Sequence, residues 1–200
     1  MLTQTQQLIL EHAKIHFLRD GFKSASLRQI VKDAGFTLGA FYGYYDSKED
    51  LFNALVDETA MGIVTILKKI SDRMDSYPKE ERMMRMSTIY LEELPDLVDY
   101  LYDHHDEVTL LFSKSEGTKY ANYMNSIQGN SQHNTVSRIQ DSANHLPIDP
   151  HAMKAIMNGY YSMVFGVILS GLEKNEVLNT LRDIQLFYQY GMLGMIQNKK

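Results

Sequence analysis

The chain has 200 residues, of which 44% are hydrophobic, and this length accommodates one domain, or a small domain joined to a larger one, around a substantial core. Its formal net charge of −5 argues against a strongly basic nucleic-acid binder as a whole, although acids and bases balance over residues 1–50. The lack of cysteine excludes disulfides and thiolate sites, and the lack of a long apolar run or an N-terminal signal segment argues against membrane insertion, so we expect a cytoplasmic protein with no membrane partner.

Apolar residues recur at steps of three and four along the chain, which predicts an all-helical protein. A first amphipathic helix is expected over residues 3–20, because Gly21 follows it where a residue with positive φ ends a helix. A second helix of about two turns begins at Ser26, whose spacing to Gln29 is that of a capping box, and ends at Gly35.

The stretch TLGAFYGYY, residues 37–45, predicts a third short helix, and Ser47 with Asp50 caps a much longer one that extends toward Ser76. Pro78 then marks a boundary. Two helices joined by a short turn and braced by a preceding helix form a helix-turn-helix, whose second helix enters the DNA major groove. The expected fold is therefore all-α, with an N-terminal three-helix DNA-binding domain and a larger helical remainder.

Two glycines stand on one side of the third predicted helix. With Phe41 at its core-facing centre, helical geometry places Leu38 and Tyr45 on the buried side and Gly39 and Gly43 on the opposite side. A face without side chains lets the backbone approach a surface such as DNA closely. The alternative is that the glycines only mark a weak, frayed helix.

The remainder of the chain is also predicted to be helical, with Pro95 separating or kinking one region and Asp149 before Pro150 giving a strong helix start. The expected segments are 81–94, 95–112, a weaker polar one over 117–142, a helix from 150 to about 172, and a last one over 176–197.

A set of residue types in the first quarter of the chain occurs together with the stretch YDSKEDLF, which enters the fourth helix. These residues are Ile9, Ala13, Phe17, Gly21, Phe22, Ser26, Leu27, Ile30, Ala34, Gly35, Gly39, Tyr42, Tyr45, Lys48 and Leu51. The combination resembles the N-terminal signature of the TetR (tetracycline repressor) family of transcriptional regulators.

The resemblance implies a dimeric, ligand-responsive regulator that binds palindromic operator DNA, usually as a repressor. It implies a DNA-binding domain over residues 1–48 and an effector-binding and dimerisation domain over 49–200. By position, it implies a groove-facing segment and a set of phosphate contacts, with Gly43 on the bare face between them. The groove-facing residues are Thr37, Leu38, Gly39 and Ala40, and the phosphate-contacting residues are Arg28, Tyr42, Tyr44 and Lys48.

Two positions differ from many members of this family. Leu38 stands where many relatives have a lysine, and Gly43 stands where they have a histidine or a bulkier residue. Fewer polar groups then reach the groove, so we expect backbone fit and phosphate contacts to carry more of the recognition.

The C-terminal helices are rich in tyrosine and methionine, which suit an apolar or aromatic effector. The pocket is predicted among Tyr90, Leu94, Leu101, Tyr123, Met124 and Met157, although core packing is the commoner role of such residues. Small residues at steps of three and four let helices approach closely, either between subunits in a dimer interface or within one subunit. These residues are Gly159, Ser162, Gly166, Ser170, Gly191 and Gly194.

Metal binding and catalysis find little support in the sequence. His12 and His16 have the i, i+4 spacing of zinc ligands on a helix, but no third ligand is placed, so we interpret them as packing or solvated histidines and expect no metal and no cofactor. Named catalytic motifs are absent, which argues against an enzyme. A helical adaptor of the same fold that does not bind DNA by itself remains the alternative.

Overall fold

The computed structural model describes residues 3–127, 129–130, 133, 137 and 149–197. Within these ranges the chain is all-α, which confirms the predicted fold class. The polar helix predicted over 117–142 lies partly outside them. No helix in the described ranges combines the length and apolar character that crossing a bilayer requires.

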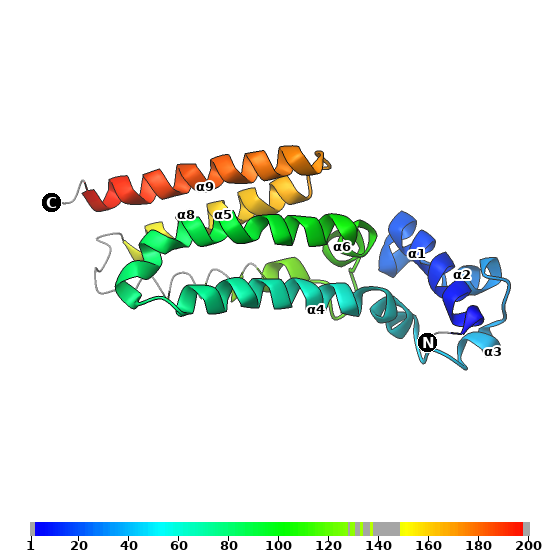
Figure 1. Ribbon diagram of the computed structural model, residues 1–200. Coiled ribbons are helices and arrows are strands. Elements are labelled where there is room, and N and C mark those ends of the chain that lie inside the picture. Colours follow the sequence, from blue (N-terminus) through cyan, green and yellow to red (C-terminus); the bar gives the residue numbers. More distant parts are fainter. Residues whose placement is uncertain (1–2, 128, 131–132, 134–136, 138–148, 198–200) are drawn as a thin grey trace. The chain divides into compact units, whose positions relative to one another are not determined.

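The N-terminal part of the chain forms three short helices and then a long one. They are α1 (Gln4–Ser24), α2 (Leu27–Asp33), α3 (Leu38–Phe41) and α4 (Lys48–Asp75) (Figure 1). α1 departs from helical geometry at Gly21, whose φ of 75° favours glycine. Ser26 caps α2, and the Ser47 hydroxyl accepts the Asp50 N–H at 3.0 Å, which confirms the predicted starts of α2 and α4.

α3 is shorter than the sequence predicts. The predicted helix continues to Tyr45, whereas α3 ends at Phe41. Beyond it the Gly43 N–H donates to the Ala40 carbonyl at 3.2 Å and the Tyr44 N–H donates to the Phe41 carbonyl at 2.9 Å. These bonds span three residues where an α-helix spans four, so the chain tightens into turns. Gly43 therefore lies in a turn beyond the helix.

The rest of the described chain includes further helices beyond α4. They are α5 (Lys79–Asp103), α6 (His105–Ser113), α8 (Pro150–Ile168) and α9 (Lys174–Gln197). Of the two possibilities predicted at Pro95, separation into two helices is wrong: α5 runs through Pro95, and the break falls at His104. The Asp149 carboxylate accepts the N–H groups of His151 and Ala152 and caps α8, as predicted.

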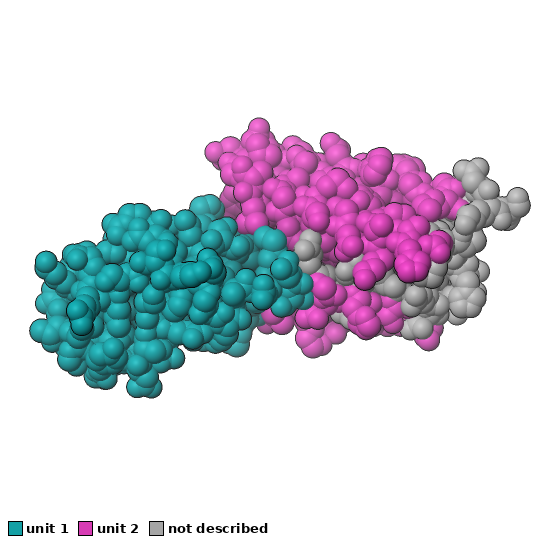
Figure 2. Space-filling view, turned by 180° about the vertical axis from the view of Figure 1, so that it is seen from behind, with its two compact units in different colours: residues 1–62, 104–126 teal, residues 63–103, 127–200 magenta. Residues whose placement is uncertain are grey.

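The helices pack into two compact units, coloured separately in Figure 2. Unit 1 comprises residues 1–62 and 104–126, and unit 2 comprises residues 63–103 and 127–200. By packing, unit 1 thus includes the beginning of α4 and all of α6 in addition to the predicted 1–48 domain. The functional boundary between residues 48 and 49 stays a prediction.

Unit 1 has an aromatic core in which α1 meets α4. The Phe17 and Phe52 rings lie 5.3 Å apart and the Phe22 and Phe52 rings 5.4 Å apart, both edge to face. α1 also packs on α2 and α6. In unit 2, α9 packs on both α5 and α8. The Tyr160 hydroxyl donates there to the Gln185 side-chain oxygen at 2.8 Å, and both side chains are buried.

Candidate nucleic-acid interface

The segment around α3 has one buried and one exposed side. Phe41 is fully buried and Tyr45 is 8% exposed, which anchors the segment on the core of unit 1. Leu38 and Ala40 are partly buried. The remaining predicted groove and backbone residues of this segment are exposed: Thr37, Gly39, Tyr42, Gly43 and Tyr44. Both glycines are therefore exposed while Phe41 is buried, but Leu38, which was predicted on the buried side, is only partly buried.

The two glycines differ in what surrounds them. A Cβ atom built on Gly39 would meet only the Thr37 hydroxyl oxygen, at 3.8 Å, which is an ordinary contact. A Cβ atom on Gly43 would lie 3.3 Å from the Ala40 carbonyl oxygen, a tight approach to backbone. The turn therefore gives Gly43 a local structural reason to be glycine. Gly39 has none in its surroundings, so its bare face is available for an outside partner.

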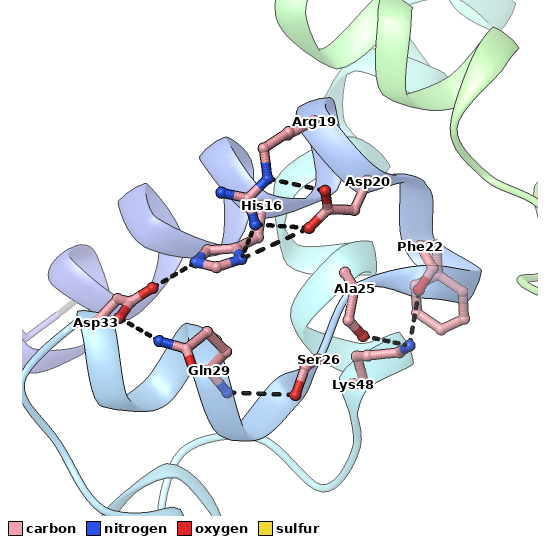
Figure 3. Close-up of polar contacts among 9 residues, drawn as sticks. All are labelled: His16, Arg19, Asp20, Phe22, Ala25, Ser26, Gln29, Asp33 and Lys48. Carbon is pink, nitrogen blue, oxygen red and sulfur yellow. Dashed lines mark hydrogen bonds and ion pairs between the residues drawn. The ribbon is translucent and has the colours of Figure 1, made fainter.

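A polar network fixes α2 against α1. The buried His16 ring lies 2.8 Å from one Asp33 carboxylate oxygen, and the Gln29 amide donates to the other at 2.6 Å (Figure 3). The other ring nitrogen of His16 lies 3.1 Å from an Arg19 guanidinium nitrogen. The hydrogen bond with His16, followed by that from Gln29, lowers the pKa of Asp33. His16 therefore positions α2. Both of its ring nitrogens lie against protein groups, Asp33 and Arg19, instead of pointing with His12 toward a shared metal site.

No cluster of three or more metal-ligating side chains occurs in the described part of the chain.

Lys48 is tied to the end of α1. Its ammonium donates to the Phe22 carbonyl at 2.7 Å and to the Ala25 carbonyl at 3.0 Å, and it lies 4.4 Å from the centre of the Phe22 ring (Figure 3). Partial burial lowers the pKa of Lys48. Because an ammonium has three N–H groups, one remains for another acceptor. The predicted phosphate contact of Lys48 stays a prediction, and the structure adds a bracing role that the sequence did not indicate.

α2 presents two cations on one row of its surface. Arg28, predicted as a phosphate contact, is exposed, and so is Lys32 one turn later. Lys32 is not among the phosphate contacts predicted from the sequence. Its i, i+4 spacing from Arg28 within the predicted helix was the feature that could have indicated it.

The residues predicted to line an effector pocket divide between the two units. Tyr123 and Met124 belong to unit 1, where the Tyr123 hydroxyl donates to the Ala60 carbonyl at 2.7 Å. Tyr90 and Met157 belong to unit 2 but pack in different clusters: Tyr90 against Ile70, Met74 and Ile89, and Met157 with Met153 and Met192. The last two, Leu94 and Leu101, are buried in α5. Neither unit brings all six together, and the pocket stays a prediction.

The small residues of α8 and α9 have two kinds of surroundings. A Cβ atom on Gly159 would lie 3.2 Å from the Tyr188 hydroxyl, so Gly159 allows α8 and α9 of the same chain to pack closely. No described atom lies within 4 Å of a Cβ atom built on Gly166, Gly191 or Gly194. Ser162 and Ser170 are exposed.

The same two helices expose large hydrophobic side chains. Phe187 is 72% exposed and Tyr190 is 70% exposed, one turn apart on α9. Met163 on α8 and Leu169 at its end are also exposed. The dimer interface predicted at the small residues of α8 and α9 stays a prediction.

Residues 9–55 match the family model described as "Bacterial regulatory proteins, tetR family". This segment contains the buried stripe of α1, the His16–Asp33 network, α3 and the start of α4. Over these residues the chain is similar to the N-terminal part of TetR-family regulators.

The chain is 30% identical over 91 residues to the uncharacterised HTH-type transcriptional regulator YfiR of Bacillus subtilis (strain 168), and the match covers 46% of this chain and 41% of YfiR. The chain spans less than half the length of the curated relatives it matches.

Solved TetR-family structures resemble the whole fold. A TetR-like transcriptional regulator from Rhodococcus sp. RHA1 superposes with a TM-score of 0.62 at 18% identity, covering 96% of this chain and 100% of that one. The SmeT–triclosan complex superposes with a TM-score of 0.51 at 16% identity, covering 94% of this chain and 91% of that one. At such low identity these likenesses establish the TetR fold alone.

Proposed function

We propose that the protein is a cytoplasmic transcriptional regulator that binds palindromic operator DNA as a homodimer and acts as a repressor released by a small apolar or aromatic effector. The observation that carries the proposal is the exposed side of the α3 segment, where Thr37 and Tyr42 flank Gly39. No side chain covers the backbone at Gly39, so another molecule can approach it closely. In a helix-turn-helix this segment is the one that enters the major groove.

The chemistry of the α3 segment suits a duplex. The Thr37 and Leu38 methyl groups can contact thymine methyl groups, and the open Gly39 surface allows close approach to base edges. The exposed Tyr42 and Tyr44 hydroxyls are suited to phosphate oxygens, which fix register and orientation. Specificity then rests on backbone fit as much as on side-chain hydrogen bonds.

A dimer is supported by the exposed surface of α8 and α9. Exposed Phe187 and Tyr190 are the aromatic anchors typical of interface centres, and Gly166 and Gly191 leave room for a partner helix. Light scattering of the wild type at micromolar concentration should give the mass of a dimer, and Gly166→Leu should weaken association. A monomeric wild type at that concentration would contradict the dimer.

An effector of apolar or aromatic character is supported by the composition of unit 2, where Tyr160 packs against the rings of Tyr90, Tyr161 and Tyr188. SmeT, which shares the fold, has been solved in complex with triclosan, an aromatic compound. Allosteric coupling is reciprocal, so operator DNA should weaken effector binding by the same factor by which the effector weakens operator binding, typically about 5- to 150-fold. Equal effector affinity with and without operator would rule out this mode of release.

The DNA-binding proposal is tested by selection from a random duplex library, followed by fluorescence anisotropy on the enriched sequence. A regulator should enrich an inverted repeat and bind it about a thousandfold or more tighter than random duplex. The adaptor alternative predicts no enrichment and no salt-dependent binding to either duplex. Catalytic turnover without DNA binding would favour an enzyme.

A further inference from the structure

Electrostatic contacts divide the basic residues of the first 50 positions into two groups, those with a partner among the described residues and those without one. Over residues 3–50, most cations are already engaged by other groups of unit 1. These pairs are Lys14 with Asp106 at 3.1 Å, Arg19 with Asp20 at 2.7 Å, Lys23 with Glu116 at 2.5 Å, and Lys48 with the carbonyls of Phe22 and Ala25. Arg28 and Lys32 are exposed and have no acidic or carbonyl partner among the described residues.

We propose that Arg28 and Lys32 form a phosphate clamp on α2 and that Lys32 is a DNA-backbone contact of this protein. The inference rests on the proposed DNA-binding function and adds to it the residues that hold the backbone.

The helical geometry of α2 gives the two cations a common direction. Ile30, Val31 and Ala34 take the buried side, and Asp33 is held toward α1 by His16. Residues four apart on a helix have Cβ atoms about 5–6 Å apart, so the Arg28 and Lys32 side chains can reach neighbouring phosphates of one strand.

The acid nearest to Lys32 in sequence does not neutralise it. Asp33 accepts a hydrogen bond from Gln29 and pairs with His16, so both of its carboxylate oxygens are engaged by other groups (Figure 3). The Arg28–Lys32 pair is therefore a local positive site on a chain whose formal net charge is −5.

The position of α2 identifies the anion as the DNA backbone. α2 is the first helix of the helix-turn-helix and contacts α3, and in this motif the first helix crosses the sugar-phosphate backbone beside the groove that the second helix enters. A flexible lysine and a forked guanidinium with unoccupied donors suit phosphate oxygens. In a dimer the clamp occurs twice, once in each half-site.

The test compares Lys32→Ala, Lys32→Arg and the matched control Lys23→Ala, which removes the same charge from a lysine already paired with Glu116. Affinity is measured by fluorescence anisotropy on the selected operator and on random duplex, between about 50 and 300 mM NaCl. Thermal unfolding of each variant is followed by circular dichroism.

For Lys32→Ala, loss of one counterion-releasing contact per half-site should lower the slope of log K against log salt by about 1.8 for the dimer. Affinity at about 100 mM salt should fall by on the order of tenfold per half-site, equally for operator and random duplex. Lys32→Arg should retain most of the slope, Lys23→Ala should retain the wild-type slope, and all variants should unfold at the wild-type temperature because the changed side chains are exposed.

Two results separate this inference from the function on which it rests. Wild-type binding to DNA together with a Lys32→Ala slope equal to that of Lys23→Ala would overturn the clamp and leave the proposed function standing. A wild-type protein without affinity for either duplex would overturn both.

Discussion

Replacing Lys48 with methionine should destabilise unit 1 as well as affect DNA binding. Methionine retains much of the aliphatic stem that lies against the Phe22 ring but removes the ammonium. The carbonyls of Phe22 and Ala25 then lose a charged donor at 2.7 and 3.0 Å. These carbonyls belong to the end of α1, so the change loosens the junction between α1 and the start of α4.

The magnitude follows from these contacts. A hydrogen bond to a charged group contributes about 1.5–3 kcal/mol, and a cation over an aromatic ring adds about 0.5–1 kcal/mol. The burial that lowers the pKa of Lys48 opposes both, and the side chain is only partly buried, so the net loss should be about 2 kcal/mol. For a chain of 200 residues that corresponds to a fall in Tm of about 4–8 °C.

The assay is thermal unfolding followed by circular dichroism, with Lys23→Met as the matched control. The Lys23–Glu116 pair is largely exposed, so its loss should leave the Tm close to that of the wild type. If Lys48→Met unfolds at the same temperature as Lys23→Met and the wild type, the bracing role assigned to Lys48 is wrong. Operator affinity of the folded variant then measures the contribution of its remaining N–H to phosphate binding.

Three further changes have distinct expected outcomes. Gly39→Ala should fold with stability raised by up to about 1 kcal/mol yet bind operator more weakly. Gly43→Ala should instead lose stability, because its Cβ atom would press on the Ala40 carbonyl. If a folded Gly39→Ala protein binds operator as tightly as the wild type, the exposed surface at Gly39 is not used for DNA binding. Tyr45→Phe should raise stability by about 1 kcal/mol, since the buried hydroxyl has no hydrogen-bond partner among the described residues, and a lower Tm in thermal unfolding would refute this. Hydrogen bonds from Lys69 and Arg73 lower the pKa of the buried Glu93. The stability that this carboxylate contributes is therefore complete above the usual carboxyl pKa of 4.5 and is lost as the pH falls through the lowered pKa of the folded state. The Tm of Glu93→Gln should fall less between neutral pH and about pH 3 than the Tm of the wild type, and parallel curves would contradict the assignment.

The sequence predicted the local structure of the helix-turn-helix well. Ser26 and Ser47 mark helix starts through hydrogen bonds to residues three positions away, and Gly21 marks the departure from helical geometry inside α1 through its own backbone preference. Adjacent residues are therefore enough to place these features. The spacing of apolar residues likewise predicted the buried side of α3. The family resemblance followed from the same local patterns, and the family comparison matches the same part of the chain.

Element lengths were less predictable where local preferences compete with packing. Residues 42–45 have the composition of a continued helix, but burial of Tyr45 against the core accompanies a turn. Pro95 indicated a helix break or kink, but α5, which packs on α9, continues through it. Neither outcome can be read from neighbouring residues, because the deciding contacts come from distant parts of the chain.

The sequence by itself determined that the chain is all-α, that it begins with a helix-turn-helix and that Gly39 lies on its bare side, because helical period and capping depend on residues within one turn. Only the tertiary structure decided which cations are already paired, that His16 holds Asp33, and that Lys48 braces the end of α1. The physical reason is range: Lys23 meets Glu116 and Lys48 meets Phe22 across 93 and 26 positions of sequence, and only the packed helices bring those atoms together.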